Sequence, residues 1–218
     1  MTSAEYLRTG RPDIEAVVET LCLAFAADPV LTWNFPLDLA NRSALVAGFF
    51  RVTTQMILDH GGEIGATANY EGLGVWSPPG ATALSEAETG DFLNALFTAC
   101  GEGGERAAII MQALDEALPA DLPAHYHVMF AAVRPGVQAQ GHAHAISNLL
   151  ARAANEAGAG VYAEASNLRS LALWERMGLR RIGPEITLPD GGPSLFPIWG
   201  DAGTWSLSPT PKPRSAPA

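Results

Sequence analysis

Apolar residues recur at helical spacing along several stretches of the chain. The first stretch begins at Pro12 and ends before Pro29, and the second begins at Asn41. A later helix opens with Ser85 and Glu88, which have the spacing of a capping box. The helices expected after the second one cover residues 85–96, 106–117, 141–156 and 168–177. Helices therefore dominate the first half of the chain and recur in the second.

Other segments are short, rich in β-branched or aromatic residues, and bounded by turn residues. The strands predicted in this way are residues 4–9, 63–67, 72–76, 126–133, 161–165, 179–188 and 194–199. Turns are expected near Asn69 and at Asp190-Gly-Gly. The resulting order, β-α-α-β-β-α-α-β-α-β-α-β-β, predicts an α/β (α+β) fold with helices packed on a sheet. Residues 1–205 are expected to form a single domain, and residues 206–218, with four prolines, a disordered tail.

Composition adds that the chain is an ordinary globular protein. It has 218 residues, of which 48% are hydrophobic and 17% charged, and no apolar run is long enough to span a bilayer. The first residues are charged and do not resemble a signal peptide, so we expect a cytoplasmic protein. Cys22 and Cys100 lie in apolar helical patterns and are expected to be reduced and buried.

Charge is distributed unevenly along the chain. The formal net charge of −10 argues against nucleic acid and anionic membranes as partners. Residues 1–129 contain 17 acidic and 5 basic residues, whereas residues 130–181 contain 6 basic and 3 acidic ones. The basic stretch suggests a bound anion, and the acidic remainder suits an amine partner or is simply a solvated surface.

One segment combines the features of a phosphate-binding loop. Residues 133–144 read Val-Arg-Pro-Gly-Val-Gln-Ala-Gln-Gly-His-Ala-His and connect a predicted strand to a predicted helix. Small residues let an anion approach the main chain, and the N–H groups of a helix N-terminus favour negative charge. The alternative is a tight strand-to-helix turn without a ligand.

The pattern Val-x-Pro-x-x-Gln-x-x-Gly-x-Ala in this segment resembles the signature of the GNAT acetyltransferases. Glu-Ala-Ser-Asn at residues 164–167 and Leu-Ala-Leu-Trp-Glu-Arg-Met-Gly-Leu at residues 171–179 are similar to later motifs of that family. Residues 24–29, 76–80, 125–128 and 190–193 resemble the branch that includes puromycin N-acetyltransferase. The resemblance extends over about residues 4–200.

This resemblance implies the GNAT acyl-CoA N-acyltransferase fold, with a mixed central sheet, a splay between two parallel strands and helices on both faces. It also implies direct transfer from acetyl-CoA, or another acyl-CoA, to a small amine that is antibiotic-like or a secondary metabolite. Arg134 is available for phosphate, or is an exposed cation. The cofactor-binding positions carried over by the resemblance are Ala131, Val133, Gln138, Ala139, Gln140, Gly141, His142, Ala143, His144, Asn167 and Ser170.

The catalytic positions depart from the family pattern. Trp174 stands where the family has a tyrosine acid, and an indole N–H is not an acid near neutral pH. The alternative function is therefore a GNAT-fold protein that has lost or changed acetyl transfer. Candidates for the base are His125 and Glu164, with Asp28 as an acceptor-side carboxylate; His125 ranks first because imidazole exchanges protons readily near neutral pH. The structural alternatives are a strand-end hydrogen bond for His125, a supporting contact for Glu164 and a helix-end aspartate.

The remaining candidates concern the acceptor and metals. Trp33, Phe35 and Trp76 could line an aromatic acceptor pocket, the first two because they are large apolar residues in a predicted loop. Phe49 and Phe50 lie on an apolar helix face and are expected in the core. The two His-x-His pairs, at residues 125–127 and 142–144, raise the alternative of a metal, but we expect none, since residues two apart on a helix point apart. Family members are often dimers, so a homodimer is one expectation.

Overall fold

The computed structural model describes the backbone of residues 6–8, and both the backbone and the side chains of residues 12–204. The predicted tail at residues 206–218 and the ends of the predicted strand at residues 4–9 lie outside the described residues. The helices are α1 (Ile14–Ala24), α2 (Pro29–Asn34), α3 (Arg42–Asp59), α4 (Glu86–Cys100), α5 (Gly104–Ala117), α6 (His142–Glu156) and α7 (Leu168–Arg176), with a 3₁₀ turn at Gly101–Gly103. The strands are β1 (Tyr6–Arg8), β2 (Glu63–Thr67), β3 (Gly72–Ser77), β4 (His125–Val133), β5 (Gly160–Ala165), β6 (Arg180–Arg181), β7 (Ile186–Thr187) and β8 (Ser194–Gly200).

The strands form one mixed sheet in the order β1-β2-β3-β4-β5-β8-β6, and β7 pairs with β8 outside this path. β4 and β5 run parallel, whereas the other described pairs are antiparallel. A parallel pair requires a crossover, and α6 supplies it. The predicted mixed sheet is confirmed.

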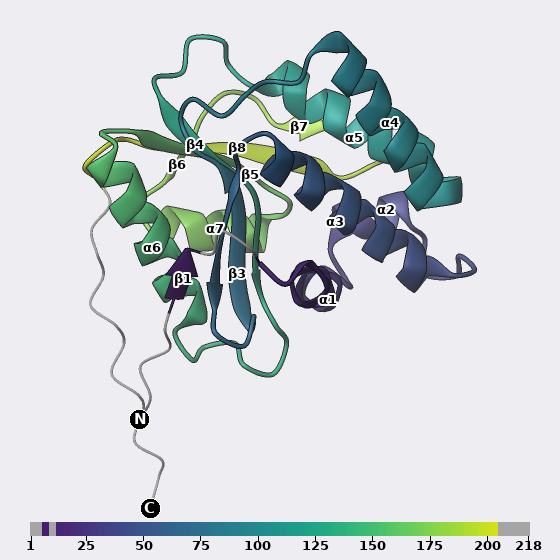
Figure 1. The fold of residues 1–218 in the computed structure, drawn as a ribbon, viewed down its shortest axis with the longest axis horizontal. Helices are drawn as coiled ribbons and strands as arrows, with labels where there is room; N and C mark the ends of the chain where they lie inside the picture. The colour runs from purple at the N-terminus through teal and green to yellow at the C-terminus, as the bar shows by residue number, and fades with distance from the viewer. Residues whose placement is uncertain (1–5, 9–11, 205–218) are drawn as a thin grey trace, which may run out of the picture.

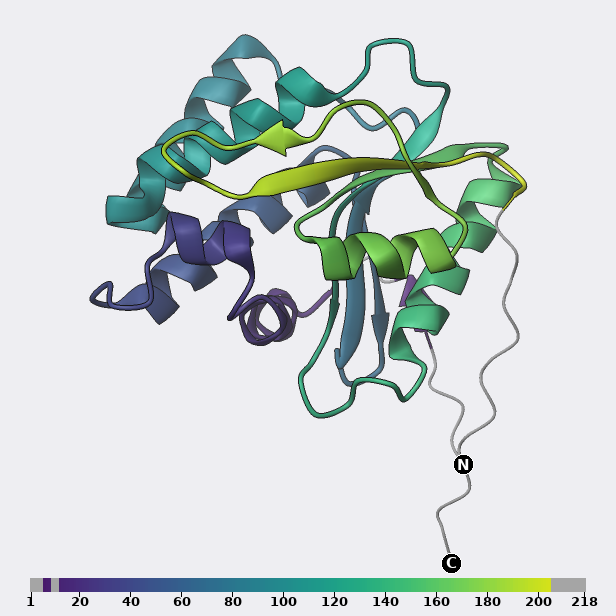
Figure 2. The same ribbon diagram turned by 180° about the vertical axis from the view of Figure 1, so that it is seen from behind.

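Helices cover both faces of the sheet (Figure 1). One apolar core gathers side chains of α1, α3, α4 and α5 against β2 and β3. A second core gathers those of α6 and α7 against the first half of β4 and against β5 and β8. Figure 2 shows α7 crossing the sheet next to α6 on the side away from α4 and α5. The expectation of helices on both faces is confirmed.

Local side-chain chemistry fixes several helix ends. Asp13 caps α1 by accepting hydrogen bonds from the N–H groups of Glu15 and Ala16. Ser85 and Glu88 form the predicted capping box of α4. Asn41 precedes α3 as predicted, but its side chain makes no capping bond, because the residue adopts a left-handed conformation with φ 58°.

Two predicted elements were wrong in detail. Pro29 does not simply end the first helix, which stops at Ala24; it is the first residue of the separate helix α2, where its missing N–H costs nothing. The single strand predicted over residues 179–188 is two short strands, β6 and β7. Gly183, with φ 62°, and Pro184, which has no N–H to donate, interrupt the ladder between them.

β4 contains a bulge. Its register with β3 steps from Val75 opposite Phe130 to Trp76 opposite Val128, so Met129 is an extra residue. Side chains of a strand point alternately to the two faces, and an extra residue reverses this alternation. Val128 accordingly belongs to the core beneath α6, whereas Phe130 belongs to the core beneath α1 and α3. A single strand therefore supplies side chains to both faces on either side of Met129.

Both cysteines are free thiols. Cys100 is buried, and burial raises its pKa to about 12; Cys22 is half-buried, and burial raises its pKa as well. The expected burial is therefore confirmed for Cys100, whereas Cys22 is only partly buried. No helix among the described residues has the length and apolarity needed to cross a membrane.

Candidate active site

The parallel strands β4 and β5 separate partway along their length. Their pairing begins with His125 opposite Gly160 and ends with Val128 opposite Ala163, although β4 continues to Val133 alongside β3. The separation begins next to the bulge at Met129, where the strand bends and twists more strongly. The predicted splay between two parallel strands is therefore present.

The second half of β4 presents main-chain groups to this opening. The N–H of Arg134 donates a hydrogen bond of 2.8 Å to the carbonyl of Glu71, next to β3. Main-chain groups alternate in direction along a strand, so those of Ala131 and Val133 point away from β3, toward the side from which β5 has departed. They therefore face the opening and not β3.

A cavity of about 110 Å³ lies at the opening. Residues 128–131 of β4 and residues 163–166 at the end of β5 line it together with side chains from both faces of the sheet. The residues of the helices and their caps that line it include Phe25, Asp28, Leu31, Phe49, Ile110 and Leu114 on one face and Ser170 and Trp174 on the other. The cavity therefore connects the two faces through the gap between the strands.

Glu164 supplies a buried carboxylate to the cavity. Its side chain is 4% exposed, and Oε2 lies 3.2 Å from Nε2 of His127, which donates to it when that nitrogen carries the proton. Oε1 has no hydrogen-bond partner among the described residues. A buried carboxylate oxygen without a partner is costly, so a donor is expected at this atom, from a water molecule, a ligand or the neighbouring Tyr162 hydroxyl.

The hydroxyl of Tyr162 lies close to Glu164. Burial, secondly the charge of Glu164, and thirdly the approach of the hydroxyl to the Glu164 carboxylate raise the pKa of Tyr162 above its ordinary value, so the hydroxyl stays neutral. It is also buried without a hydrogen-bond partner among the described residues. His127 and Tyr162 are register partners on β4 and β5, with ring centroids 5.0 Å apart. Sequence reasoning missed Tyr162 and considered His127 only as part of a metal site.

Asp28 is the second carboxylate of the cavity, and its oxygens are fully engaged. Oδ1 accepts from the N–H groups of Val30 and Leu31 at 2.9 and 3.4 Å, and Oδ2 accepts from Ser166 Oγ at 2.5 Å and Asn167 Nδ2 at 3.4 Å. Burial raises the pKa of Asp28 above its ordinary value, although these hydrogen bonds lower it in part. Asp28 is thus the N-cap of α2, not the end of α1, and ties α2 to the turn between β5 and α7.

The loop between β4 and α6 leaves the first turn of that helix uncapped. Gly141 is the N-cap residue with φ 94° and offers no side chain to the free N–H groups. Gln138, Ala139 and Gln140 are exposed, and residues 141–144 are half-buried. Ala139 has φ 64°, a conformation that glycine adopts without strain and alanine does not. This geometry suits an anion at the helix N-terminus.

Comparison with known proteins agrees with this architecture. Neither a protein-family model nor a curated protein matches the sequence. A Corynebacterium glutamicum protein described as a histone acetyltransferase and related acetyltransferase has a similar structure, with TM-score 0.65 and 21% identity over 92% of this chain and 97% of that one. Arylalkylamine N-acetyltransferase 2 from Aedes aegypti has TM-score 0.62 and 11% identity over 90% and 98%. An agmatine N-acetyltransferase has TM-score 0.60 and 12% identity over 90% and 98%.

The chain has the GNAT fold. The splay of β4 from β5 and the cavity within it occupy the centre of that fold. These similarities at low identity concern the backbone arrangement, so the roles of individual side chains depend on their own geometry in this chain.

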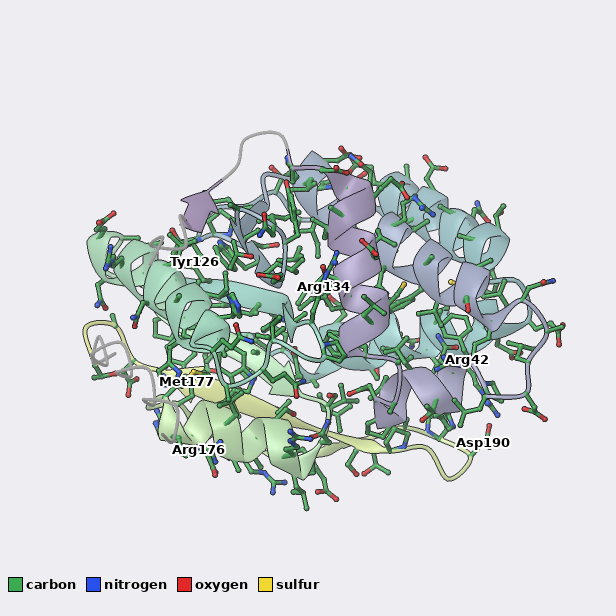
Figure 3. All side chains as sticks on the ribbon, turned by 90° about the horizontal axis from the view of Figure 1, so that it is seen from below. Arg42, Tyr126, Arg134, Arg176, Met177 and Asp190 are labelled. Atoms are coloured by element: carbon green, nitrogen blue, oxygen red, sulfur yellow. The ribbon has the colours of Figure 1, made fainter. Side chains whose placement is uncertain are left out.

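Two side chains that were predicted to be available for phosphate interact instead with other residues of the chain. Arg134 lies next to α1, where Nε donates to Thr20 Oγ1 and Nη2 to Glu19 Oε2, both at 2.7 Å (Figure 3). The His142 side chain is 11% exposed, and its Nε2 lies 3.8 Å from Glu71 Oε2 near the start of β3. Main-chain N–H groups, including that of His142 itself, are thus better placed for an anion than either side chain.

The start of α7 holds two further predicted residues. Asn167 and Ser170 form a reciprocal capping box, in which each side chain accepts from the main-chain N–H of the other. Ser170 and Trp174 line the cavity, one turn of α7 apart. Trp174 therefore lines the cavity from α7.

Four of the residues predicted for catalysis or for the acceptor pocket lie outside the cavity lining. The Nδ1 atom of His125 is 2.7 Å from the carbonyl of Pro123, which is the strand-end bond considered as its alternative. Trp33 and Phe35 are not in a loop: Trp33 belongs to α2 beneath the guanidinium of Arg106, and Phe35 ends that helix in the core. Trp76 is fully buried beneath α6.

Phe49 and Phe50 are core residues as expected, and Phe49 also lines the cavity. Within residues 12–204, no three histidine, cysteine or carboxylate side chains gather in a way that could hold a metal ion. His127 instead contacts Glu164, and His142 points toward Glu71.

Proposed function

We propose that the protein is an acetyl-CoA-dependent N-acetyltransferase that transfers the acetyl group directly to a small amine in a ternary complex. The observation that carries this proposal is the cavity at the splay, which is lined by Glu164, a residue whose carboxyl group is buried and whose Oε1 has no hydrogen-bond partner among the described residues. The solved structures similar in fold are described as acetyltransferases of agmatine and of arylalkylamines, which supports an amine acceptor.

The residues present fit an acyl-CoA molecule. Main-chain groups of Ala131 and Val133 face the opening and would bind the pantetheine arm in the manner of an added strand. Main-chain N–H groups of residues 138–144, together with the dipole of α6, would bind the pyrophosphate. Ser170 lines the cavity next to the arm.

Acetyl-CoA, when bound, supplies a thioester whose acetyl group an amine nitrogen can accept. An amine is mostly protonated near pH 7, so a base must first remove a proton. Glu164 Oε1 is placed to take that proton, with Oε2 held by His127. We prefer Glu164 to His125 because Glu164 lines the cavity. The new N–C bond replaces the C–S bond, and the departing thiolate takes a proton from solvent.

The acceptor class is proposed from the sequence resemblance. Residues 24–29, 76–80, 125–128 and 190–193 are similar to the branch that includes puromycin N-acetyltransferase. These segments include Asp28, which lines the cavity, and His127, which contacts Glu164, and both support the resemblance as a guide to the acceptor. An antibiotic-like or secondary-metabolite amine is therefore the proposed acceptor.

Binding of acetyl-CoA to the full chain tests the proposal by isothermal titration. We expect a Kd below about 1 mM. Ala139→Gly should retain this affinity, whereas Ala139→Val should weaken it about threefold to tenfold, because a β-branched residue resists a positive φ and shifts the loop. Gln140→Val places the same side chain on the neighbouring exposed position and serves as the control. Absence of binding at millimolar acetyl-CoA would remove the proposed function.

A second candidate function is a GNAT-fold protein that no longer completes acetyl transfer. Trp174 favours it, because this side chain lines the cavity where a hydroxyl acid is expected. Release of CoA, measured with a thiol reagent, separates the two functions. If water already protonates the thiolate, Trp174→Tyr raises the rate by less than about tenfold. A larger gain, from a wild-type rate near background, would support the second function.

A further inference from the structure

The charge of the cavity lining has one sign. The described side chains that line the cavity include the carboxylates of Asp28 and Glu164 but no lysine, arginine or histidine. Both carboxyl groups are buried, and burial of a charge is costly unless a partner compensates it. The cavity therefore suits a cationic ligand.

Only one of the two carboxylates has an oxygen to offer. Asp28 already accepts four hydrogen bonds, two from main-chain N–H groups of α2 and two from the side chains of Ser166 and Asn167. Glu164 uses Oε2 for His127 and leaves Oε1 unpartnered in a side chain that is 4% exposed. One carboxylate oxygen can compensate one ammonium group.

The cavity wall formed by β4 and the helices on the side of α1, α3 and α5 is otherwise apolar. Phe130 contacts Phe25 and Phe49 edge to face, with ring centroids 6.2 and 6.3 Å apart. Leu31 of α2 and Ile110 of α5 complete the wall. A second ammonium group placed against this wall would lose its hydration without gaining a partner, which costs several kcal/mol in general.

The size of the cavity limits the apolar part of the ligand. Its volume is about 110 Å³, and apolar cavities of roughly 150 Å³ admit a benzene-sized ring. Part of the space must also receive the reacting end of the acyl donor. The ligand body is therefore compact.

We infer that the acceptor is a compact monoamine, in which one primary ammonium group binds the Glu164 carboxylate and an apolar body no larger than a single ring packs against Phe25, Phe49 and Phe130. A polyamine is excluded from this site by its second charge. The inference rests on the proposed acetyl transfer for its chemistry, but it concerns recognition and can be measured without turnover.

The test compares three probes by isothermal titration against the full chain in about 0.15 M salt, where surface attraction of polycations is screened. The probes are 2-phenylethylamine, spermidine and the uncharged 2-phenylethanol, each titrated with and without unacetylated CoA. We expect 2-phenylethylamine to bind at least tenfold more tightly than either of the others. Equal or tighter binding of spermidine would overturn the inference, and so would binding of none of the three.

Variants locate the site. Glu164→Gln should remove the preference for 2-phenylethylamine over 2-phenylethanol, whereas Glu175→Gln, which makes the same change on an exposed position of α7, should keep it. Persistence of the preference in Glu164→Gln would overturn the assignment to this carboxylate. If the amine preference holds but acetyl-CoA does not bind, the proposed function fails and the inference stands. If acetyl-CoA binds and the amine preference is absent, the inference fails alone.

Discussion

Replacement of Glu164 by glutamine is expected to lower kcat/KM for acetyl transfer by about 10²- to 10⁴-fold, the range typical of a general base. Glutamine has the same shape and can retain the hydrogen bond to His127, but its amide oxygen cannot take a proton from the amine. The Kd for acetyl-CoA should stay unchanged, because main-chain groups of β4 and α6 would hold that molecule. Steady-state kinetics and titration of acetyl-CoA measure the two effects separately.

Companion variants identify the base. Glu175→Gln should have no effect, since this glutamate is exposed on α7. His127→Gln should lower kcat/KM by about tenfold, because it still offers a donor to Glu164 but holds it less firmly. An inactive His125→Gln variant beside an active Glu164→Gln variant would transfer the base to His125 and contradict the proposal.

The second large effect concerns stability. Asp28→Ala is expected to lower the free energy of unfolding by about 2–3 kcal/mol, since it removes the cap of α2 and leaves Ser166 and Asn167 without their acceptor. Asp28→Asn should restore most of this loss, because the amide oxygen still caps the helix. Urea unfolding at pH 7 measures both changes, and Asp38→Ala, an exposed aspartate in the loop after α2, is the control. A loss no larger than that of Asp38→Ala would contradict the proposed tie.

The same residue predicts a pH dependence. Burial raises the pKa of Asp28 in the folded state above its unfolded value, so folding favours the protonated form. Its contribution to stability is therefore complete below the unfolded pKa and is lost as the pH rises through the folded pKa. Wild type should gain stability relative to Asp28→Asn as the pH is lowered from 7.5 toward about 4.5. A constant or opposite difference would show that hydrogen bonds outweigh burial.

Much of the fold was readable from the sequence because local signals agreed. Helix ends depend on residues that are close in sequence. The start of α4 is set by the capping box of Ser85 and Glu88, and the ends of α6 and α7 are set by the glycines that follow them, so these ends could be predicted from the sequence. The helix α2 was missed because it has only six residues, and Pro29 was interpreted only as an end of α1. A proline ends one helix and opens another with the same chemistry, which a single sequence does not distinguish.

The site was less predictable because it depends on register. His127 contacts Glu164 because β4 and β5 pair in parallel, with His127 opposite Tyr162. His127 and Glu164 are 37 residues apart in the sequence, so no local pattern predicts this contact. The sequence placed His125 and His127 on one face and named His125 as a candidate base, whereas His127 is the histidine that contacts Glu164, a residue of the cavity lining. Trp33 was assigned to a pocket because the helix around it was not predicted. The bulge at Met129 had no signal in an otherwise regular strand.

That bulge has a consequence for how the specificity of such a protein can diversify. Because the side chains of the strand change face at Met129, substitutions within this one segment change the cavity lining on both faces of the sheet. Leu31, Ile110 and Leu114 reach the cavity from helices on one face only. Under the proposed function, substitutions at these three helix positions can change which acceptor binds while the sequence of β4 stays the same. Redesign of the protein should begin there.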